Sequence, residues 1–97
     1  MDRRDREKMA ATMRALAHPT RLEVLAAVNS EEQSPSQFSD AGPGRPTLGT
    51  ASHHFRALRR AGLIEVSATE QRRGAIMRSY RPTATGARVN RWLGRLR

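Results

Sequence analysis

Residues 47–63 read TLGTASHHFRALRRAGL, a run that begins with small and hydroxylated residues and ends in arginines before a glycine. Apolar side chains recur in it at spacings of three or four residues, which predicts a helix with one packing face. Thr47 is placed to cap its start, and Gly62 is placed to end it, with Leu63 packing back. The predicted packing face comprises Leu48, Ala51, Phe55 and Leu58.

The opposite side of this helix displays Gly49, Thr50, His53, Arg56 and Arg60. A metal site, a solvated basic surface and a nucleic-acid contact are the three roles open to such a helix. Adjacent histidines such as His53 and His54 point about 100° apart on a helix, so they do not chelate one ion together. Leu58 stands one turn after His54, where a second ligand would be needed. We therefore expect no metal and no cofactor.

The net charge of +9 is concentrated in the second part of the chain. Residues 1–44 carry six basic and seven acidic side chains, whereas residues 45–97 carry twelve arginines and two glutamates. Arginine presents a flat fork of donors that suits phosphates and guanine edges. A solvated basic face or a membrane-surface patch is the alternative, but this pattern favours a nucleic-acid partner.

The length of 97 residues indicates one small domain covering residues 1–97. Cysteine is absent, which excludes disulfides and thiolate metal sites. No apolar run approaches the roughly 18 residues of a membrane-spanning helix. The start, MDRRDREKMAAT, also lacks the apolar centre of a signal peptide. We therefore expect a cytoplasmic protein with no membrane partner.

Three predicted helices precede the opening stretch. The first spans residues 2–17 and is amphipathic; His18 and Pro19 break it, because the residue before a proline avoids the helical region. The second spans Pro19–Val28, and a short third helix begins at Ser34, the predicted cap. The segment DAGPGRP, residues 40–46, is too rich in glycine and proline for regular structure and is predicted to be a turn.

After Gly62 the apolar period changes to two, which predicts strands over 63–69 and 75–81. Between them EQRRG, residues 70–74, is predicted to be an arginine-rich hairpin tip, and residues 69–75 are the part of the wing expected to contact nucleic acid. Pro82 and Thr83 then open a last helix. Its apolar stripe is Val89, Trp92, Leu93 and Leu96, with Arg88, Arg91, Arg95 and Arg97 around it.

This order predicts a mainly α (α+β) winged helix-turn-helix fold with about five helices and a two-stranded β-hairpin wing. A helix fits the major groove of duplex DNA, while a hairpin tip can reach the backbone or the minor groove. Arg72 and Arg73 are predicted to anchor phosphates, because a hairpin tip has no structural need for two adjacent arginines. Thr50, His53 and Arg56 are predicted to read sequence, whereas Arg59 is interpreted as solvated.

The first and last helices carry apolar stripes that a 97-residue monomer does not easily cover. We therefore predict a two-fold homodimer, with the two DNA-reading helices roughly 34 Å apart. Trp92 is interpreted as part of the dimer core rather than of a ligand site. The predicted interface comprises Met9, Met13, Leu16, Val89, Trp92, Leu93 and Leu96.

Four segments together resemble successive blocks of the ArsR-like winged helix-turn-helix transcriptional regulators: ALAHPTRLEVLAAV, SPSQFSD, LGTASHHFRALRRAGLIEV and RGAIMRSYRPT. The resemblance runs from about Leu16 to Thr83. It is closest to the subgroup with a Leu-Gly-x-x-Ser-x-His recognition helix and an Arg-Gly-Ala wing. The resemblance implies a homodimer that binds palindromic operator DNA, often as a repressor.

Carried onto this chain, the resemblance implies a recognition helix over Thr47–Ala61 and wing contacts from Arg72 and Arg73. His54 matches an inward histidine of the family, for which we expect a hydrogen bond to backbone. Two departures stand out: the turn 40–46 is about two residues longer than usual, and the family's metal-sensing ligand pairs are missing. The residues implied to face DNA are Thr47, Gly49, Thr50, Ser52, His53 and Arg56. Arg60, on the outer side of the same helix, is predicted to contact DNA as well.

The sequence has no nucleophile signature, and no carboxylate lies beside the paired histidines to orient them. We therefore do not expect an enzyme. Two rival functions remain open at this point. One is a sequence-neutral architectural or RNA-binding protein, and the other is a winged-helix module that docks on another protein. A small-molecule effector bound in the dimer is also compatible with the sequence.

Overall fold

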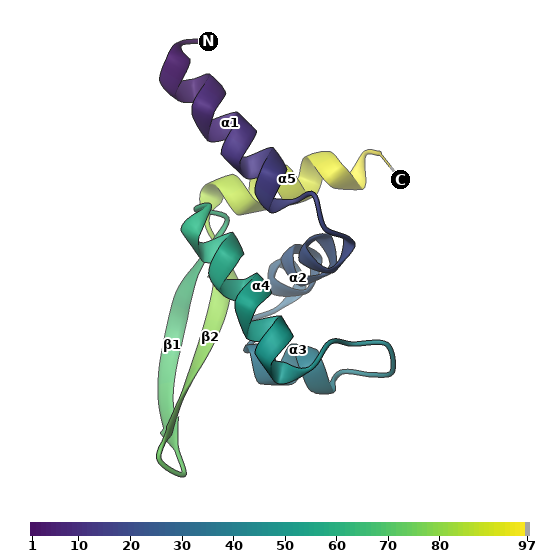
Figure 1. Cartoon of the computed structure of the whole chain (residues 1–97), viewed down its shortest axis with the longest axis vertical. Helices are drawn as coiled ribbons and strands as arrows, with labels where there is room; N and C mark the ends of the chain where they lie inside the picture. Colours follow the sequence, from purple (N-terminus) through teal and green to yellow (C-terminus); the bar gives the residue numbers. More distant parts are fainter. Residues whose placement is uncertain (97) are drawn as a thin grey trace.

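The computed structural model describes residues 1–96, and within them five helices and one antiparallel hairpin follow one another (Figure 1). This is the predicted mainly helical, winged helix-turn-helix architecture, with the hairpin as the wing. Arg97, which the sequence places among the arginines around the last helix, lies outside the described residues. The elements are α1 (Arg3–Ala15), α2 (Pro19–Ser30), α3 (Pro35–Asp40), α4 (Leu48–Arg60), β1 (Ile64–Arg72), β2 (Ala75–Pro82) and α5 (Ala84–Gly94).

Side-chain caps explain where several helices begin. Ser34 and Gln37 form a capping box at the start of α3, and Pro35 occupies its first turn. The Thr47 hydroxyl accepts a hydrogen bond from the backbone N–H of Thr50, 3.3 Å away, at the start of α4. These caps satisfy backbone donors that a helix start otherwise leaves unpaired, so they confirm the predicted boundaries.

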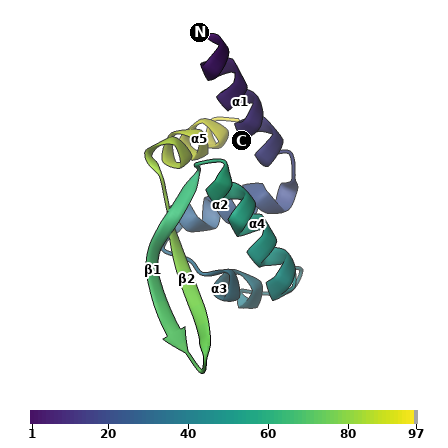
Figure 2. The same cartoon turned by 60° about the vertical axis from the view of Figure 1, so that its left-hand side comes forward.

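The core lies where α2, α3 and α4 meet the base of the hairpin. Phe55 of α4 is fully buried, with its ring centroid 5.9 Å from that of Phe38 and 5.4 Å from that of Tyr80. Figure 2 shows the hairpin extending from this core alongside α4 and α3, while α1 and α5 lie at the other end. The core cluster comprises Val24, Leu25, Val28, Phe38, Ala51, Phe55, Leu58, Leu63, Ile64 and Tyr80.

The end of α4 follows the predicted glycine stop. Gly62 has a positive φ of 77°, which glycine adopts without strain. Its N–H donates to the Arg59 carbonyl, and the N–H of Leu63 donates to the Leu58 carbonyl at 3.0 Å. Leu63 is fully buried, so the chain turns directly from α4 into β1 with both hydrogen bonds and apolar packing holding the joint.

Leu48 departs from the prediction for the packing face of α4. Ala51, Phe55 and Leu58 are fully buried as expected, but 53% of Leu48 is exposed. Leu48 is the first residue of the helix, with only Thr47 between it and the glycine- and proline-rich turn. Periodicity places it on the correct side of the helix, but the core reaches Ala51 and does not extend to the first residue. Its assignment to the packing face was therefore wrong.

The wing is longer than predicted and its loop is shorter. The strands stay paired from Ile64↔Pro82 to Arg72↔Ala75, with one register shift between Val66 and Ala68. Three residues of the predicted tip 70–74 are therefore strand, and only Arg73 and Gly74 remain between the paired residues. The polar residues Glu70 and Gln71 suggested a loop, but a hairpin exposed on both faces needs no apolar alternation to pair.

The long turn between α3 and α4 is tied to the rest of the chain. The Ser39 hydroxyl donates a 2.7 Å hydrogen bond to the Pro46 carbonyl. Arg45 pairs with Glu23 of α2 at 3.2 Å, and its guanidinium lies 4.2 Å from the centre of the Phe38 ring. These contacts hold Arg45 and Pro46, at the end of the turn, against α2 and α3.

The terminal helices contribute little to the core. Ala15 is the buried residue of α1, and Gly86 is the buried residue of α5. The start of α5 is anchored by Thr83, whose hydroxyl donates a 2.6 Å hydrogen bond to the Gly62 carbonyl. Within residues 1–96, no helix has both the length and the apolar character needed to cross a bilayer.

Candidate nucleic-acid interface

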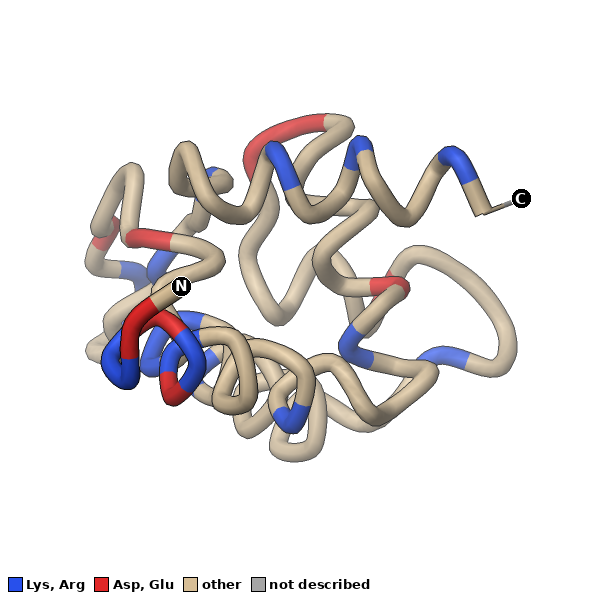
Figure 3. The backbone as a smooth tube through the Cα atoms, turned by 90° about the horizontal axis from the view of Figure 1, so that it is seen from above, with Lys and Arg blue, Asp and Glu red and all other residues tan. Residues whose placement is uncertain are grey.

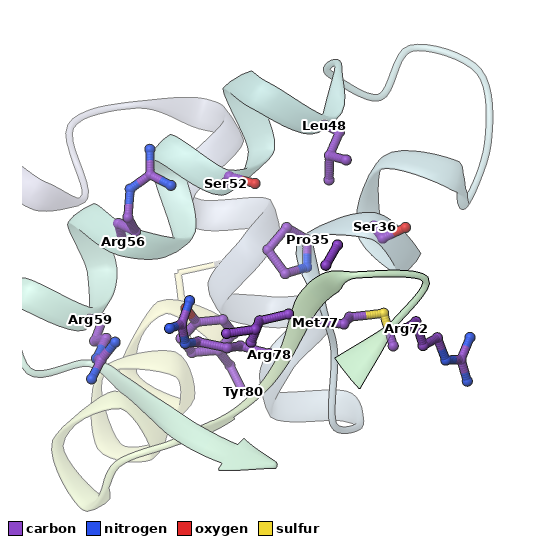
Figure 4. Close-up of a pocket in the computed structure, with 12 residues that line it drawn as sticks. Pro35, Ser36, Leu48, Ser52, Arg56, Arg59, Arg72, Met77, Arg78 and Tyr80 are labelled. Atoms are coloured by element: carbon purple, nitrogen blue, oxygen red, sulfur yellow. The ribbon is translucent and has the colours of Figure 1, made fainter. Parts of the chain in front are cut away.

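A cleft of about 410 Å³ separates α4 from the hairpin (Figure 4). Helix α4 lines it with one stripe of side chains spaced four, four and three residues apart: Leu48, Ser52, Arg56 and Arg59. The hairpin lines it with Arg72, Ala75, Ile76, Met77, Arg78 and Tyr80, and the start of α3 adds Pro35 and Ser36. The stripe on α4 faces the wing because Ala51, Phe55 and Leu58 hold the adjoining side of the helix in the core.

Four arginines line this cleft, and no carboxylate does. Arg72 pairs with Glu70 at 2.9 Å on the exposed wing. Within residues 1–96, Arg56, Arg59 and Arg78 take part in none of the ion pairs. A concave surface with one sign of charge concentrates its field toward the solvent in the opening. The cleft is therefore suited to a polyanion with a repeating phosphate backbone.

The two terminal helices differ from the cleft in their charge: α1 carries both signs, and α5 is basic but distant from the wing tip. Along α1, acidic and basic residues alternate, and they appear as neighbouring red and blue segments beside the N-terminus in Figure 3. Helix α5 carries arginines and no acidic residue, but it lies away from the wing tip (Figure 1). The cleft differs from both because arginines of a helix and of a hairpin line one concavity.

Some of the predicted DNA-facing residues line this cleft and others do not. Ser52, Arg56 and Arg72 line it. Five others are exposed on or beside α4 but outside the cleft lining: Thr47, Gly49, Thr50, His53 and Arg60. Thr47 and Thr50 have their hydroxyls 3.2 Å apart at the helix start, so these two side chains also bond to each other.

Two further arginines line the cleft. Arg59 is exposed, as its interpretation as solvated requires, and lies one turn from Arg56 along the same stripe. Arg78 is absent from the predicted contacts. The sequence signal for it lies in β2, where Ile76, Arg78 and Tyr80 fall on one side of the strand. Because Tyr80 is buried against Phe55, that side had to face α4.

The wing tip holds an arginine in an unfavourable backbone conformation. Arg73 has a φ of 50° and Gly74 a φ of 79°, the signature of a two-residue type I′ turn. Asparagine or glycine normally occupies the first of these positions, and other residues there cost about 1–2 kcal/mol. A strained residue at an exposed tip points to a role for its side chain outside the fold.

His54 is held by a side chain rather than by backbone, which corrects the expectation. Its Nδ1 accepts a 3.1 Å hydrogen bond from Nε of Arg21, and the same guanidinium donates to the Ala15 carbonyl at 3.2 Å. This links the end of α1, the start of α2 and the middle of α4. The expectation erred because His54 is half-buried at a junction of three helices, where a long side chain reaches it first.

Burial lowers the pKa of His54 below its ordinary value of 6.5, and the nearby charges of Arg21, His53 and His18 lower it further. The rings of His53 and His18 lie 5.5 and 6.0 Å from that of His54, centre to centre. The neutral imidazole with its proton on Nε2 is the form that accepts from Arg21. Among the described residues, no three potential ligand side chains gather to hold a metal ion.

The predicted dimer residues divide into two groups. Leu16, Val89 and Leu93 are half-buried and pack against the chain's own core. The other four are exposed: Met9 and Met13 on α1, Trp92 on α5 and Leu96 just after α5, with 61% of Met13 and 55% of Trp92 open to solvent. Large exposed apolar side chains on both terminal helices are typical of a surface that another protein chain covers.

Comparison with known proteins supports this architecture. A family model described as a helix-turn-helix domain matches residues 16–67. HlyU from Vibrio cholerae superimposes with a TM-score of 0.77 at 22% identity, covering 98% of this chain and 97% of the other. No curated protein matches the sequence.

Two further solved structures carry a more specific description. One is a homodimeric winged helix-turn-helix DNA-binding domain of a possible ArsR-family transcriptional regulator from Mycobacterium bovis. It has a TM-score of 0.75 and 26% identity, and the alignment covers 99% of this chain and 85% of that one. An ArsR-like transcriptional regulator from Rhodococcus has a TM-score of 0.66 at 25% identity, with 95% and 81% covered. Both agree with the ArsR-like resemblance; the subgroup motif of the recognition helix stays a prediction.

Proposed function

The chain belongs to the helix-turn-helix domain family, and we propose that it is a DNA-binding transcriptional regulator that acts as a homodimeric repressor at a palindromic operator. The observation that carries the proposal is the cleft between α4 and the wing, lined by four arginines and by no carboxylate. A duplex supplies the phosphates that such a cleft attracts, and its major groove admits a helix of the kind that forms one wall.

The proposed division of labour follows from where the side chains stand. Arg59 and Arg78 contact the phosphates of the strand that passes between helix and wing. Thr50, His53 and Arg56 approach base edges together with Ser52, because a recognition helix lies in the major groove. Arg72 and Arg73 reach the neighbouring backbone or minor groove from the tip of the wing. Phosphate contacts position the protein, and base contacts select the sequence.

The homodimer is proposed on the exposed apolar residues of α1 and α5, which lie at the end of the molecule away from the wing tip (Figure 1). Pairing these helices about a two-fold axis would leave both clefts free. It would also set the recognition helices about one turn of DNA apart, roughly 34 Å. A palindromic operator mirrors that symmetry.

The two rival functions differ in what they require of DNA. A sequence-neutral architectural or RNA-binding protein would use the same arginines but show no sequence preference. A protein-docking module would not need three unpaired arginines in one cleft. The mixed polar surface of α4 around Thr50 and His53 supports sequence reading over the first rival, and the charge of the cleft supports DNA over the second.

The experiment is selection of bound sequences from a random duplex pool, followed by affinity measurements in rising salt. Wild-type protein is expected to enrich a palindrome. Arg73→Ala is expected to weaken binding to all sequences alike and to reduce the slope of log affinity against log salt by about 1. The matched control, Arg4→Ala, removes the same charge from α1 and should leave the slope nearly unchanged.

Other outcomes would identify a rival. A steep salt slope without enrichment of any sequence means the architectural function, and absence of duplex binding means protein docking. If Arg4→Ala lowers the slope as much as Arg73→Ala does, net charge rather than the wing accounts for binding, and the proposed wing contact is wrong.

A further inference from the structure

Leu48 is an apolar side chain in a cationic cleft, and the fold does not use it as core. It is 53% exposed, begins α4, and lines the cleft together with Ser52 and Arg56 (Figure 4). Isolated exposed leucines are common on protein surfaces. This one differs because it lies at the start of the helix that forms the cleft wall, on the stripe that also carries the unpaired arginines.

The surroundings of Leu48 limit what can cover it. The start of α4 lies beside α3, at the end of the molecule opposite α1 (Figure 1), so pairing through the terminal helices leaves it open. The cleft that it lines carries four arginines and no carboxylate, which favours a polyanion over an apolar protein surface. On a duplex, the apolar group displayed in the major groove is the C5-methyl of thymine.

We propose that Leu48 contacts the C5-methyl group of a thymine and selects that base at one position of each half-site. This inference rests on the proposed function, since it requires that α4 enters the major groove. The first residues of a recognition helix contact base edges, and Leu48 is the first residue of α4. Ser52, one turn further along the same stripe, can bond to a neighbouring base or phosphate while Leu48 covers the methyl group.

Ile76 provides a matched comparison within the same cleft. It is 60% exposed and apolar, but it stands on β2, where it pairs with Gln71 near the wing tip. A wing reaches the backbone or the minor groove, and the minor groove displays no methyl group. Leu48 should therefore depend on thymine methyl groups, whereas Ile76 should not.

Deoxyuridine tests this directly, because it removes the methyl group and keeps every hydrogen-bonding atom of thymine. Each thymine of the sequence enriched from the random pool is replaced in turn by deoxyuridine, and binding is measured with wild type, Leu48→Ala and Ile76→Ala. At one thymine per half-site, wild-type affinity is expected to fall about fourfold, the equivalent of exposing one buried methyl group. Ile76→Ala should show the same loss, and Leu48→Ala should bind both duplexes equally.

A second variant gives a gain rather than a loss. In Leu48→Gln a side chain of similar reach carries an amide, which pairs with adenine in the major groove. Pool selection with this variant should replace the thymine at that position by adenine. Thermal unfolding of both Leu48 variants checks that they fold, and alanine and glutamine suit a helix at least as well as leucine at an exposed site.

The outcomes separate this inference from the function on which it rests. If the pool enriches a sequence but deoxyuridine has no effect at any position, or the loss persists in Leu48→Ala, the role of Leu48 is wrong and the regulator function stands. If no sequence is enriched, the regulator function fails and the role of Leu48 fails with it.

Discussion

Helices α1 and α4 are both 13 residues long, yet they differ greatly in how many of their residues are buried. Four residues of α4 are buried, including Phe55 and Leu58, while α1 buries Ala15 alone. Packing on one side fixes the rotation of α4 about its axis, so its other side chains are presented at defined positions. Because α1 has no such packing within the chain, its exposed methionines are available to a partner.

The largest expected effect comes from removing the packing of α4. Phe55→Ala should lower the free energy of unfolding by about 3–5 kcal/mol, because Phe55 is fully buried between Phe38 and Tyr80. Met13→Ala on α1 should change it by less than about 0.5 kcal/mol under conditions that keep the protein monomeric. Urea unfolding at low protein concentration measures both. Equal losses would contradict the contrast between the two helices.

The next prediction concerns α1 as an interface. Met13→Glu places a charge on the exposed apolar side of α1 and should weaken dimerisation at least about tenfold, because an unpaired carboxylate is costly to bury. Sedimentation over a range of concentrations measures the association. Ala11→Glu adds the same charge to an exposed position on the other side of α1 and should have little effect. Similar losses in both variants would mean that charge, and not the methionine surface, controls association.

A smaller effect is expected at Gly49, in the first turn of α4. A Cβ added there meets nothing within 4 Å, so Gly49→Ala should stabilise the helix by up to about 1 kcal/mol. If DNA approaches closely at this position, the same change should weaken operator binding. Thermal unfolding and duplex binding are measured on the same preparation. Higher stability with unchanged affinity would show that Gly49 is a tolerated surface glycine.

The smallest expected effect lies where α1 and α4 are linked, at Arg21 and His54. Since the folded protein holds the pKa of His54 below 6.5, the unfolded chain binds more protons as the pH falls through 6.5. The contribution of His54 to stability is therefore complete above pH 6.5 and decreases as the pH falls toward the lower folded pKa.

Urea unfolding between pH 5 and 8, with an NMR titration of the imidazoles, measures this effect. His54→Gln keeps an acceptor for Arg21 and should remove that part of the pH dependence. His53→Gln, at the neighbouring exposed position, should retain it. A His54 that titrates above 6.5 in the folded protein would reverse the sign and refute the prediction.

Much of the fold could be predicted from the sequence because its signals are local. Caps such as Ser34 and Thr47 act on donors within three residues, and Gly62 relieves strain at its own φ. The winged helix-turn-helix order followed from such signals and from the change of apolar period after Gly62. The hairpin tip was less accurate, since pairing of Glu70 with Met77 depends on a partner strand rather than on either residue's own preference.

The candidate site was predicted in part, for a related reason. The outer side chains of α4 and the arginines of the wing could be named from helical period and turn composition. Arg59 and Arg78 were not predicted, because it is the tertiary structure that brings these residues of α4 and β2 to one cleft. The exposure of Leu48 was not predicted either. The helical period indicates on which side of the helix a residue lies, but not how far along the helix the core extends.

The sequence by itself determined the order of elements, their ends, and the concentration of arginine after residue 44, because each depends on residues near one another in the chain. Only the tertiary structure decided which arginines share a cleft and that the core leaves Leu48 exposed. It also decided that Arg21, rather than a backbone group, bonds to His54. These are properties of surfaces formed by distant segments, and their geometry is set by how α4 packs in the core.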